Sequence, residues 1–209
     1  MKTEIIKADH PISLIHAADV LRHGGLVAFP TDTVYGLASI PFEQSSIDRL
    51  FVAKGRNSNQ AISILISKFD DLKEITLGIG DVAQRLVERF WPGPLTLVVP
   101  RNPALPDLIS PNDTIGVRMP DHPVALALLR DIGPLAVTSA NLSGYENSNT
   151  AQEVMNQLNG RIHLIIDGGT TGGRIPSTVV DCTVPDLVVL RPGPITMDDM
   201  RRELSGLRY

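Results

Sequence analysis

Small polar side chains stand between two apolar stretches near the start of the chain. Thr31, Asp32 and Thr33 follow the apolar run 26–29 and precede Val34-Tyr35. Such a group is either a turn or the polar edge of a binding site, because ligands of α/β proteins gather where strands end. We interpret Asp32 as a turn residue or a support for its neighbours, in preference to a general base.

Similar polar or cationic groups adjoin other apolar stretches. Each has a local explanation, such as a turn, a rim ion pair or a favourable charge at a helix end. Their recurrence points instead to one shared pocket. Several cations there indicate an anionic small molecule, since arginine binds carboxylate or phosphate through paired donors. The groups are Thr138-Ser139-Ala140-Asn141, Arg118, Arg191, Ser177 and Lys54-Gly55-Arg56.

Several standard catalytic motifs are missing from the sequence. It contains neither a G-x-x-x-x-G-K-[ST] phosphate loop nor a G-x-S-x-G nucleophile elbow. The histidines form no metal-spaced pair, and one cysteine cannot build a zinc site. Cys182 follows an apolar run, so we expect a core thiol and not a nucleophile.

Charge and cysteine content narrow the class of protein. A formal net charge of -4 and a pI near 5.7 argue against a surface built for general nucleic-acid binding. A single cysteine excludes an internal disulfide framework and fits a reducing compartment, so we expect a cytoplasmic protein. The charged N-terminus lacks a signal-peptide pattern and no apolar run approaches ~18 residues, so we expect no membrane association.

Helical and strand patterns alternate along the chain without a repeat or a linker, which predicts one domain over 1–209. Wholly apolar strands indicate an α/β fold with a mixed, twisted sheet covered on both faces. The glycine-rich segment 168–174 is predicted as a mobile connecting loop, with a cover over the pocket as the alternative. Helices are predicted from a Ser13 cap to Gly24-Gly25, around 47–51, over 81–90, over 123–132, after a capping box at 150–153 and over 196–204. Strands are predicted over 26–29, 61–66, 95–99, 114–117, 135–138, 162–166, 178–180 and 187–190.

The chain carries, in this order, the segments Phe29-Pro30-Thr31-Asp32-Thr33-Val34-Tyr35-Gly36-Leu37, Lys54-Gly55-Arg56, Trp91-Pro92-Gly93-Pro94-Leu95-Thr96, Gly116-Val117-Arg118-Met119-Pro120, Ser139-Ala140-Asn141-Leu142-Ser143-Gly144, Pro176-Ser177-Thr178 and Leu190-Arg191-Pro192-Gly193-Pro194. Together they resemble the YrdC-like domain of the threonylcarbamoyl-AMP synthases, over about residues 13–195. The resemblance implies the short single-domain form, without the second C-terminal domain of longer members. It also implies an open, twisted sheet of parallel and antiparallel strands flanked by helices, with a concave, positively lined cavity.

The same resemblance implies an enzyme, an L-threonylcarbamoyladenylate synthase and thus a nucleotidyltransferase. Its substrates would be L-threonine, bicarbonate and ATP, and its products threonylcarbamoyl-adenylate and pyrophosphate. This reaction is the first step of N6-threonylcarbamoyladenosine formation in tRNA, and a downstream threonylcarbamoyl transferase complex would use the adenylate. The nucleotide would carry Mg²⁺, because no carboxylate cluster indicates a metal cage. No covalent nucleophile is required.

Site residues are implied by their places in the matching motifs. Lys54 and Arg56, together with Arg191, would stabilise charge on the reacting phosphate. Two positions depart from the pattern of relatives: Gln60 replaces a nucleotide-contacting asparagine, and Leu65 replaces a threonine-contacting histidine found in some members. The implied L-threonine contacts are Thr33, Arg118, Val137 and Ser177, and the implied ATP contacts are Arg56, Gln60, Thr114, Ser139, Asn141 and Arg191, with Asn147 less definite.

Two other functions stay open at this point. The concave face could bind double-stranded RNA or tRNA without turnover, although the acidic net charge and the lack of RNP-type aromatic motifs favour weak binding at most. Gln60 and Leu65 also leave open a paralogue that acts on another carbamoyl-type substrate.

Overall fold

The computed structural model describes residues 2–55, 60–173 and 175–205. Its strands are β1 (Glu4–Lys7), β2 (Val27–Phe29), β3 (Gly36–Ser39), β4 (Ser63–Leu65), β5 (Leu95–Pro100), β6 (Thr114–Arg118), β7 (Leu135–Ser139), β8 (Leu164–Asp167), β9 (Thr178–Asp181) and β10 (Val188–Arg191). They form one sheet in the order β1-β8-β2-β3-β7-β4-β6-β5-β9-β10. Parallel pairing joins β1 to β8, β2 to β8, β4 to β6 and β5 to β9, and the other neighbours are antiparallel. The predicted mixed sheet is thereby confirmed.

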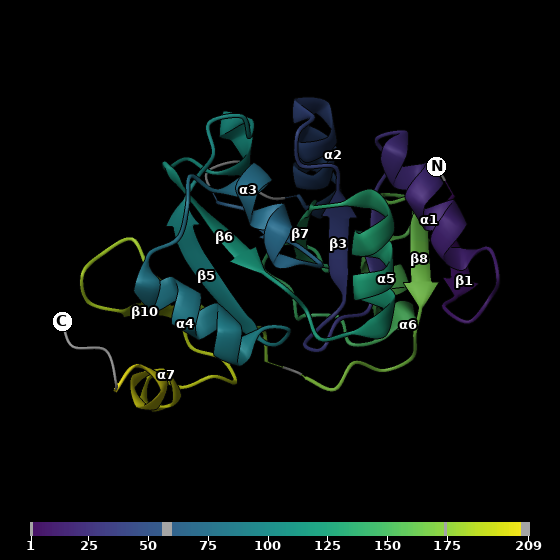
Figure 1. Cartoon of the computed structure of the whole chain (residues 1–209). Helices are drawn as coiled ribbons and strands as arrows, with labels where there is room; N and C mark the ends of the chain where they lie inside the picture. Colours follow the sequence, from purple (N-terminus) through teal and green to yellow (C-terminus); the bar gives the residue numbers. More distant parts are fainter. Residues whose placement is uncertain (1, 56–59, 174, 206–209) are drawn as a thin grey trace.

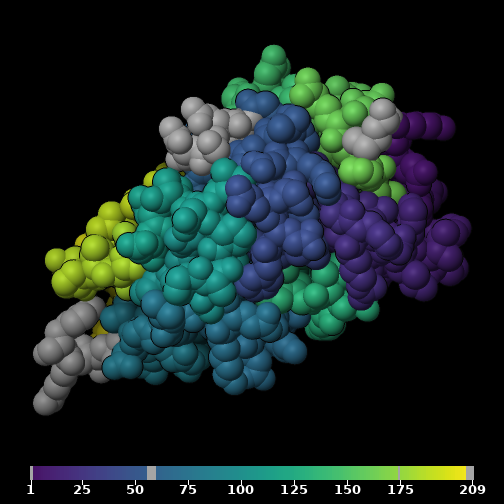
Figure 2. Space-filling model, turned by 90° about the horizontal axis from the view of Figure 1, so that it is seen from above, coloured from purple at the N-terminus to yellow at the C-terminus, as the bar shows by residue number. Residues whose placement is uncertain are grey.

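The helices are α1 (Ser13–Arg22), α2 (Gln44–Lys54), α3 (Leu72–Ile75), α4 (Asp81–Phe90), α5 (Pro123–Ile132), α6 (Ala151–Leu158) and α7 (Met197–Leu204). Short 3₁₀ turns lie at Phe69–Asp71 and Asp107–Ile109. The elements β1 and α1 lie at one end of the molecule, and β10 and α7 lie at the other (Figure 1). Seen from above, the molecule is elongated between these two ends (Figure 2). Within the described ranges, no helix is both long enough and apolar enough to cross a bilayer.

Two apolar clusters cover the two faces of the sheet. One contains Leu21 of α1 and Leu128 of α5 together with Phe29 and Leu164 of the sheet, and Figure 1 shows α1 and α5 on the same side. The larger cluster contains residues of α2, α4, α6 and α7. Burial on both faces explains why several strands are apolar at every position.

Local signals placed some elements better than others. The predicted helices 81–90 and 123–132 are observed with the same bounds. Pro123 opens α5, because its fixed φ suits the first turn of a helix. Ser13 is not the predicted cap: it is the first residue of α1, and its hydroxyl donates to the Ala8 carbonyl at 3.0 Å. The predicted strand 61–66 is observed as the shorter strand Ser63–Leu65.

Candidate active site

A cavity of about 350 Å³ lies on the sheet face formed by β3, β7, β4, β6 and β5. Successive side chains of a strand alternate between faces, so residues two apart reach the same side. Ser63 and Leu65 of β4, Val137 of β7 and Arg118 of β6 share this face through the pairs Ser63↔Val137 and Leu65↔Arg118. All four line the cavity. The sheet register therefore builds the floor of the site.

Two glycines keep this floor open. A Cβ atom on Gly36 would lie 2.8 Å from Cγ1 of Val137, and one on Gly116 would lie 2.8 Å from Oγ of Ser63. Both distances are shorter than the non-bonded contacts of a Cβ atom allow. Larger residues at these positions would push Val137 or Ser63 out of place.

Arg118, the last residue of β6, is held from three sides. Its Nε donates to the Gly93 carbonyl at 2.9 Å, its Nη1 donates to Thr33 Oγ1 at 3.0 Å, and its Nη2 pairs with the Asp32 carboxylate. Burial lowers the pKa of Arg118, the Asp32 carboxylate raises it, and the charge of Arg191 lowers it. A guanidinium has five N–H groups. Arg118 therefore presents an oriented cation at the cavity wall with donors beyond these three bonds.

The turn between β2 and β3 is held by its own hydroxyls. Thr31 Oγ1 donates to the Val34 carbonyl at 2.6 Å and accepts from the Thr33 N–H at 3.2 Å. The hydroxyl oxygens of Thr31 and Thr33 lie 3.1 Å apart, and both residues are buried at the cavity wall. The polar cluster of the sequence is thus both a turn and an edge of the site.

Ser177, which precedes β9, is hydrogen-bonded to residues of β5 and β10 at the cavity. Arg191 of β10 donates to the Ser177 carbonyl from Nε at 3.1 Å and from Nη2 at 2.9 Å, and Nη2 also donates to Ser177 Oγ at 3.0 Å. The hydroxyls of Ser177 and Thr96 of β5 lie 2.7 Å apart. This network places a second guanidinium beside a buried hydroxyl pair.

Lys54, the last residue of α2, points toward the segment that follows β7. Its Nζ donates to the carbonyls of Ser139 and, at 2.7 Å, of Asn141, and the residue is only 3% exposed. The Asn141 amide donates to the carbonyls of Leu142 at 2.8 Å and Tyr145 at 2.9 Å. Its buried Oδ1 has no hydrogen-bond partner in the described structure. The amide of Asn141 therefore has its donors engaged and, among the described residues, one buried acceptor left unbonded.

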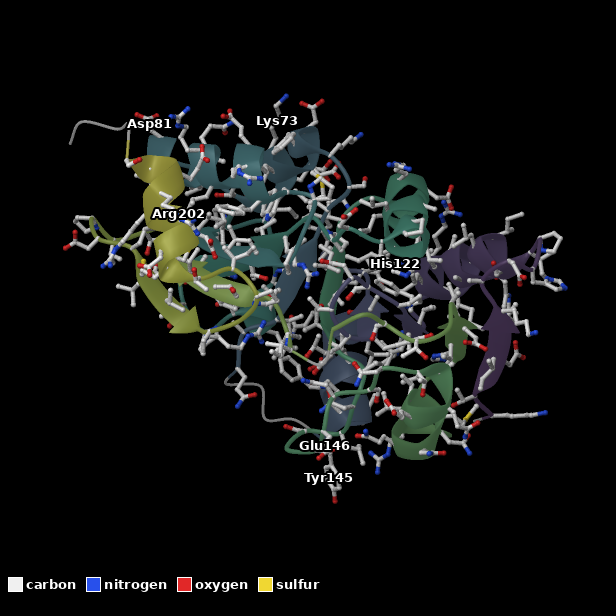
Figure 3. The ribbon with its side chains drawn as sticks, turned by 90° about the horizontal axis from the view of Figure 1, so that it is seen from below. Lys73, Asp81, His122, Tyr145, Glu146 and Arg202 are labelled. Carbon is white, nitrogen blue, oxygen red and sulfur yellow. The ribbon has the colours of Figure 1, made fainter. Side chains whose placement is uncertain are left out.

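The segment 143–147 forms the rim next to Asn141. Ser143, Gly144 and Asn147 line the cavity. Tyr145 and Glu146 project from this rim, away from the rest of the molecule (Figure 3), and Tyr145 is 68% exposed. The rim thus has one face toward the cavity and one toward solvent.

The described part of the glycine-rich loop, 168–173, is bonded to the turn between β2 and β3. Tyr35 Oη donates to the Gly169 carbonyl at 2.8 Å and accepts from the Gly168 N–H at 3.2 Å, while the Gly173 N–H donates to the Thr33 carbonyl at 3.2 Å. None of residues 168–173 is among the described residues that line the cavity. The described part of the loop is thus hydrogen-bonded to the turn outside the described cavity lining, and its motion stays a prediction.

The structure brings most of the predicted site residues to one cavity. Thr114 lies on β6 four residues before Arg118, on the same sheet face but outside the described lining. Arg56 lies outside the described residues. Sequence reasoning placed Thr31 at the edge of the shared pocket, where it lies, but missed Ser63 and Thr96 as lining residues, although Thr96 stands inside a quoted motif. The predicted residues at the cavity are Thr33, Lys54, Gln60, Arg118, Val137, Ser139, Asn141, Ser177 and Arg191, with Asn147 and the substituted Leu65 beside them.

The donor set of the cavity does not fit a protein-held divalent cation. Its described lining includes Lys54, Arg118 and Arg191 but no aspartate, glutamate or histidine, and hard cations prefer carboxylate oxygens. Across the part of the chain that the structure describes, no group of three or more His, Cys, Asp or Glu side chains could hold a metal. The cavity is suited to anions.

The chain is similar in sequence to a known family of proteins. Residues 19–193 match the Sua5/YciO/YrdC family model, described as "Telomere recombination". The chain is 41% identical to the threonylcarbamoyl-AMP synthase of Pyrococcus abyssi over 92% of its own length and 57% of that relative. It is 38% identical to a putative threonylcarbamoyl-AMP synthase of Mycobacterium tuberculosis, over 92% of this chain and 89% of the relative.

A solved structure shows the same architecture. The crystal structure of P. abyssi Sua5 complexed with L-threonine matches with a TM-score of 0.93 and 40% identity, over 99% of this chain and 62% of that one. The chain thus spans less than two thirds of the Pyrococcus protein. The predicted YrdC-like α/β fold is confirmed, and the chain belongs to the Sua5/YciO/YrdC family.

Proposed function

We propose that this chain is an L-threonylcarbamoyladenylate synthase, which converts L-threonine, bicarbonate and ATP to threonylcarbamoyl-adenylate and pyrophosphate. The observation that carries the proposal is the composition of the cavity. Lys54, Arg118 and Arg191 share it with hydroxyl and amide groups, and its described lining has no carboxylate. Opposite charges attract strongly where water is excluded, so such a cavity can hold an amino-acid carboxylate and a triphosphate together.

The amino acid would bind at the Arg118 end. Arg118 has donors left for a carboxylate, and arginine binds carboxylates through paired N–H groups. The Thr33 hydroxyl adjoins this guanidinium. Leu65 and Val137 supply an apolar floor against which the threonine methyl group can pack. The Pyrococcus relative has been solved in complex with L-threonine, which supports L-threonine as the substrate amino acid.

The nucleotide would bind toward Lys54, Ser139 and Asn141. Ser139 and Asn141 line this end of the cavity, and hydroxyl and amide groups can hydrogen-bond to a ribose or an adenine base. Arg191 would face the phosphates, because a guanidinium pairs well with phosphate oxygens. Thr114 and Arg56 belong to the same proposal, without a described contact in its favour.

The reaction needs orientation and charge more than a reactive side chain. The neutral amine of threonine and bicarbonate give a carbamate and water. A carbamate oxygen then forms a bond to the α-phosphorus of ATP, the bond to the bridging oxygen breaks, and pyrophosphate leaves. Holding both anions in one cavity lowers the entropic part of the activation barrier, because the reacting atoms are already close and oriented. Arg191 and Lys54 stabilise the charge that develops on the phosphate.

Magnesium would arrive with the nucleotide. The carboxylate-free lining does not fit a protein-held ion, so no step is assigned to it. Delivery of the adenylate to a threonylcarbamoyl transferase complex, weak tRNA contact and a cytoplasmic location stay predictions. A paralogue with another substrate stays the alternative, because Leu65 cannot offer a hydrogen bond.

Pyrophosphate release tests the proposal. We expect release from ATP that requires both L-threonine and bicarbonate, and we expect Arg118→Ala to abolish it. Arg101→Ala is the matched control, because the Arg101 side chain is only 9% exposed and is ion-paired to Asp107, outside the described cavity lining. ATP binding without pyrophosphate release, in the presence of both co-substrates, would overturn the assignment.

A further inference from the structure

The Asp32 carboxylate is attached to Arg118 and to little else. Its side chain is 14% exposed and pairs with Arg118 Nη2 through Oδ1. Its Oδ2 is buried and has no hydrogen-bond partner within the described structure. A buried acceptor without a partner costs free energy. Asp32 is therefore not a member of a fully bonded structural network.

We propose that Asp32 is a positioning residue that aims the Arg118 guanidinium at the carboxylate of the substrate amino acid. The proposal rests on the function proposed above. Asp32 itself does not belong to the described lining of the cavity, whereas Arg118 does. Its effect on substrate must accordingly pass through the guanidinium.

The surroundings of Arg118 show why such a residue is needed. Gly93 and Thr33 occupy its Nε and Nη1, but both acceptors are neutral. Arg191 is a second cation close enough to disfavour the charge of Arg118. Asp32 is the charged partner that offsets this repulsion and holds Nη2. Without Asp32, the Arg118 guanidinium would lose one of its three hydrogen-bond partners, and no carboxylate would offset its repulsion by Arg191.

The hydrogen bonds around the cavity predict which of the two substrates the loss of Asp32 should affect. The Asp32 side chain forms its hydrogen-bonded ion pair with the guanidinium that we assign to the amino acid, whereas the two cations assigned to the nucleotide, Arg191 and Lys54, bond to other partners. Loss of Asp32 should therefore affect L-threonine and not ATP. A residue that merely supported the fold would affect both substrates.

The test compares steady-state pyrophosphate release by Asp32→Asn and Asp32→Ala with the wild type. Asp32→Asn keeps the shape and one acceptor oxygen for Nη2 but removes the charge. We expect Asp32→Ala to lower kcat/KM for L-threonine about tenfold to hundredfold, mainly through KM, and Asp32→Asn to lower it less. The KM for ATP should change less than about twofold in both. Asp107→Ala, which removes the carboxylate of the Arg101 pair, should change neither constant.

L-Threoninol, an amino alcohol without a carboxylate, supplies a second readout. As a competitive inhibitor it should keep its inhibition constant within about twofold in Asp32→Asn, because it has no group for Arg118 to bind. Unchanged kcat/KM for L-threonine in the Asp32 variants, or equal losses for L-threonine and ATP, would overturn the proposal. If Asp32→Ala does not fold, Asp32→Asn decides.

Failure of the two proposals can be told apart. If the wild type releases no pyrophosphate, the synthase assignment fails. Calorimetric titration with L-threonine then tests Asp32 alone. Weaker binding to Asp32→Asn than to the wild type supports the positioning role, and equal binding or no binding to either contradicts it.

Discussion

The Arg191 guanidinium donates to both the backbone and the side chain of Ser177. Nε and Nη2 lie 3.1 and 2.9 Å from the Ser177 carbonyl oxygen, and Nη2 lies 3.0 Å from the Ser177 hydroxyl. Arg191 is the cation that we assign to the nucleotide, and Ser177 is assigned to L-threonine. The proposed L-threonine and nucleotide sites therefore adjoin at this contact. The reaction requires such a junction, because the carbamate must reach the α-phosphate of ATP.

Removal of the Ser177 hydroxyl should impair the use of L-threonine. In Ser177→Ala, Thr96 Oγ1 and Arg191 Nη2 each lose a buried partner. We expect kcat/KM for L-threonine to fall about tenfold or more in steady-state assays, the cost of one or two hydrogen bonds. Ser205→Ala is the control, since the Ser205 hydroxyl donates to the Arg202 carbonyl at 2.7 Å, away from the described cavity lining. Equal activity of both variants would remove Ser177 from the site.

Lysine should not replace arginine at position 191. Nε and Nη2 of Arg191 donate together to the Ser177 carbonyl, and an ammonium group cannot reproduce this fork. We expect Arg191→Lys to lower kcat at least about tenfold and Arg191→Ala to lower it further, with a higher KM for ATP. Wild-type turnover in Arg191→Lys would show that only the charge matters.

Lys54 should contribute to stability as well as to charge. Lys54→Met keeps the buried aliphatic stem but deprives the carbonyls of Ser139 and Asn141 of their donor. Two lost charge-assisted bonds should lower the free energy of unfolding by about 2–4 kcal/mol in urea titrations. Lys73→Met is the matched control, because Lys73 is 80% exposed and pairs with Asp70 at the surface (Figure 3). If both variants lose the same stability, Lys54 does not anchor the wall.

Tyr35 should make the protein less stable in alkali. Burial raises the pKa of Tyr35 from 10.0 to about 12. Between these values the unfolded chain loses the proton while the folded protein keeps it, so stability is complete below pH ~10 and falls as pH rises, by at most about 1.4 kcal/mol per pH unit.

The Tyr35→Phe variant measures the part of this alkaline loss of stability that comes from Tyr35. At pH 8 it should be about 1–3 kcal/mol less stable than the wild type, because Gly168 N–H and the Gly169 carbonyl lose their partner. At pH 11 the deficit should shrink by about 1 kcal/mol, since only the wild type carries the alkaline penalty. Urea titrations at both pH values measure it. The raised pKa of Cys182 affects both proteins equally. A deficit that stays constant with pH would contradict the assignment.

Elements with strong local signals could be predicted from the sequence. Helix α4 has a regular apolar spacing and α5 begins with a proline, and both were located correctly. Strands β1 and β3 were missed. Of these, β1 is largely exposed and β3 is the four-residue segment Gly36–Ser39, so their strand conformation depends on pairing with β8 and β7. Such pairing is a tertiary effect that propensity does not encode.

The residues of the site could also be predicted in part, whereas their mutual contacts could not. Motif order identified many of the residues that line the cavity, but their contacts depend on distant pairs such as Arg118 with Asp32, 86 positions apart. Asp32 was predicted as a turn or a support, and only the fold shows that what it supports is Arg118. The bonds of Lys54 to the carbonyls of Ser139 and Asn141 could not be predicted either, because a lysine at a helix end has an adequate local explanation.

The identity of the product tests the central claim most directly. The purified protein would be incubated with ATP, L-threonine and ¹³C-bicarbonate, and the nucleotide products separated and analysed by mass spectrometry. The account predicts an adenylate that contains one threonine and one ¹³C carbon, formed together with pyrophosphate and absent when L-threonine is omitted. Release of pyrophosphate without ¹³C in the nucleotide product, or no new adenylate at all, would contradict it.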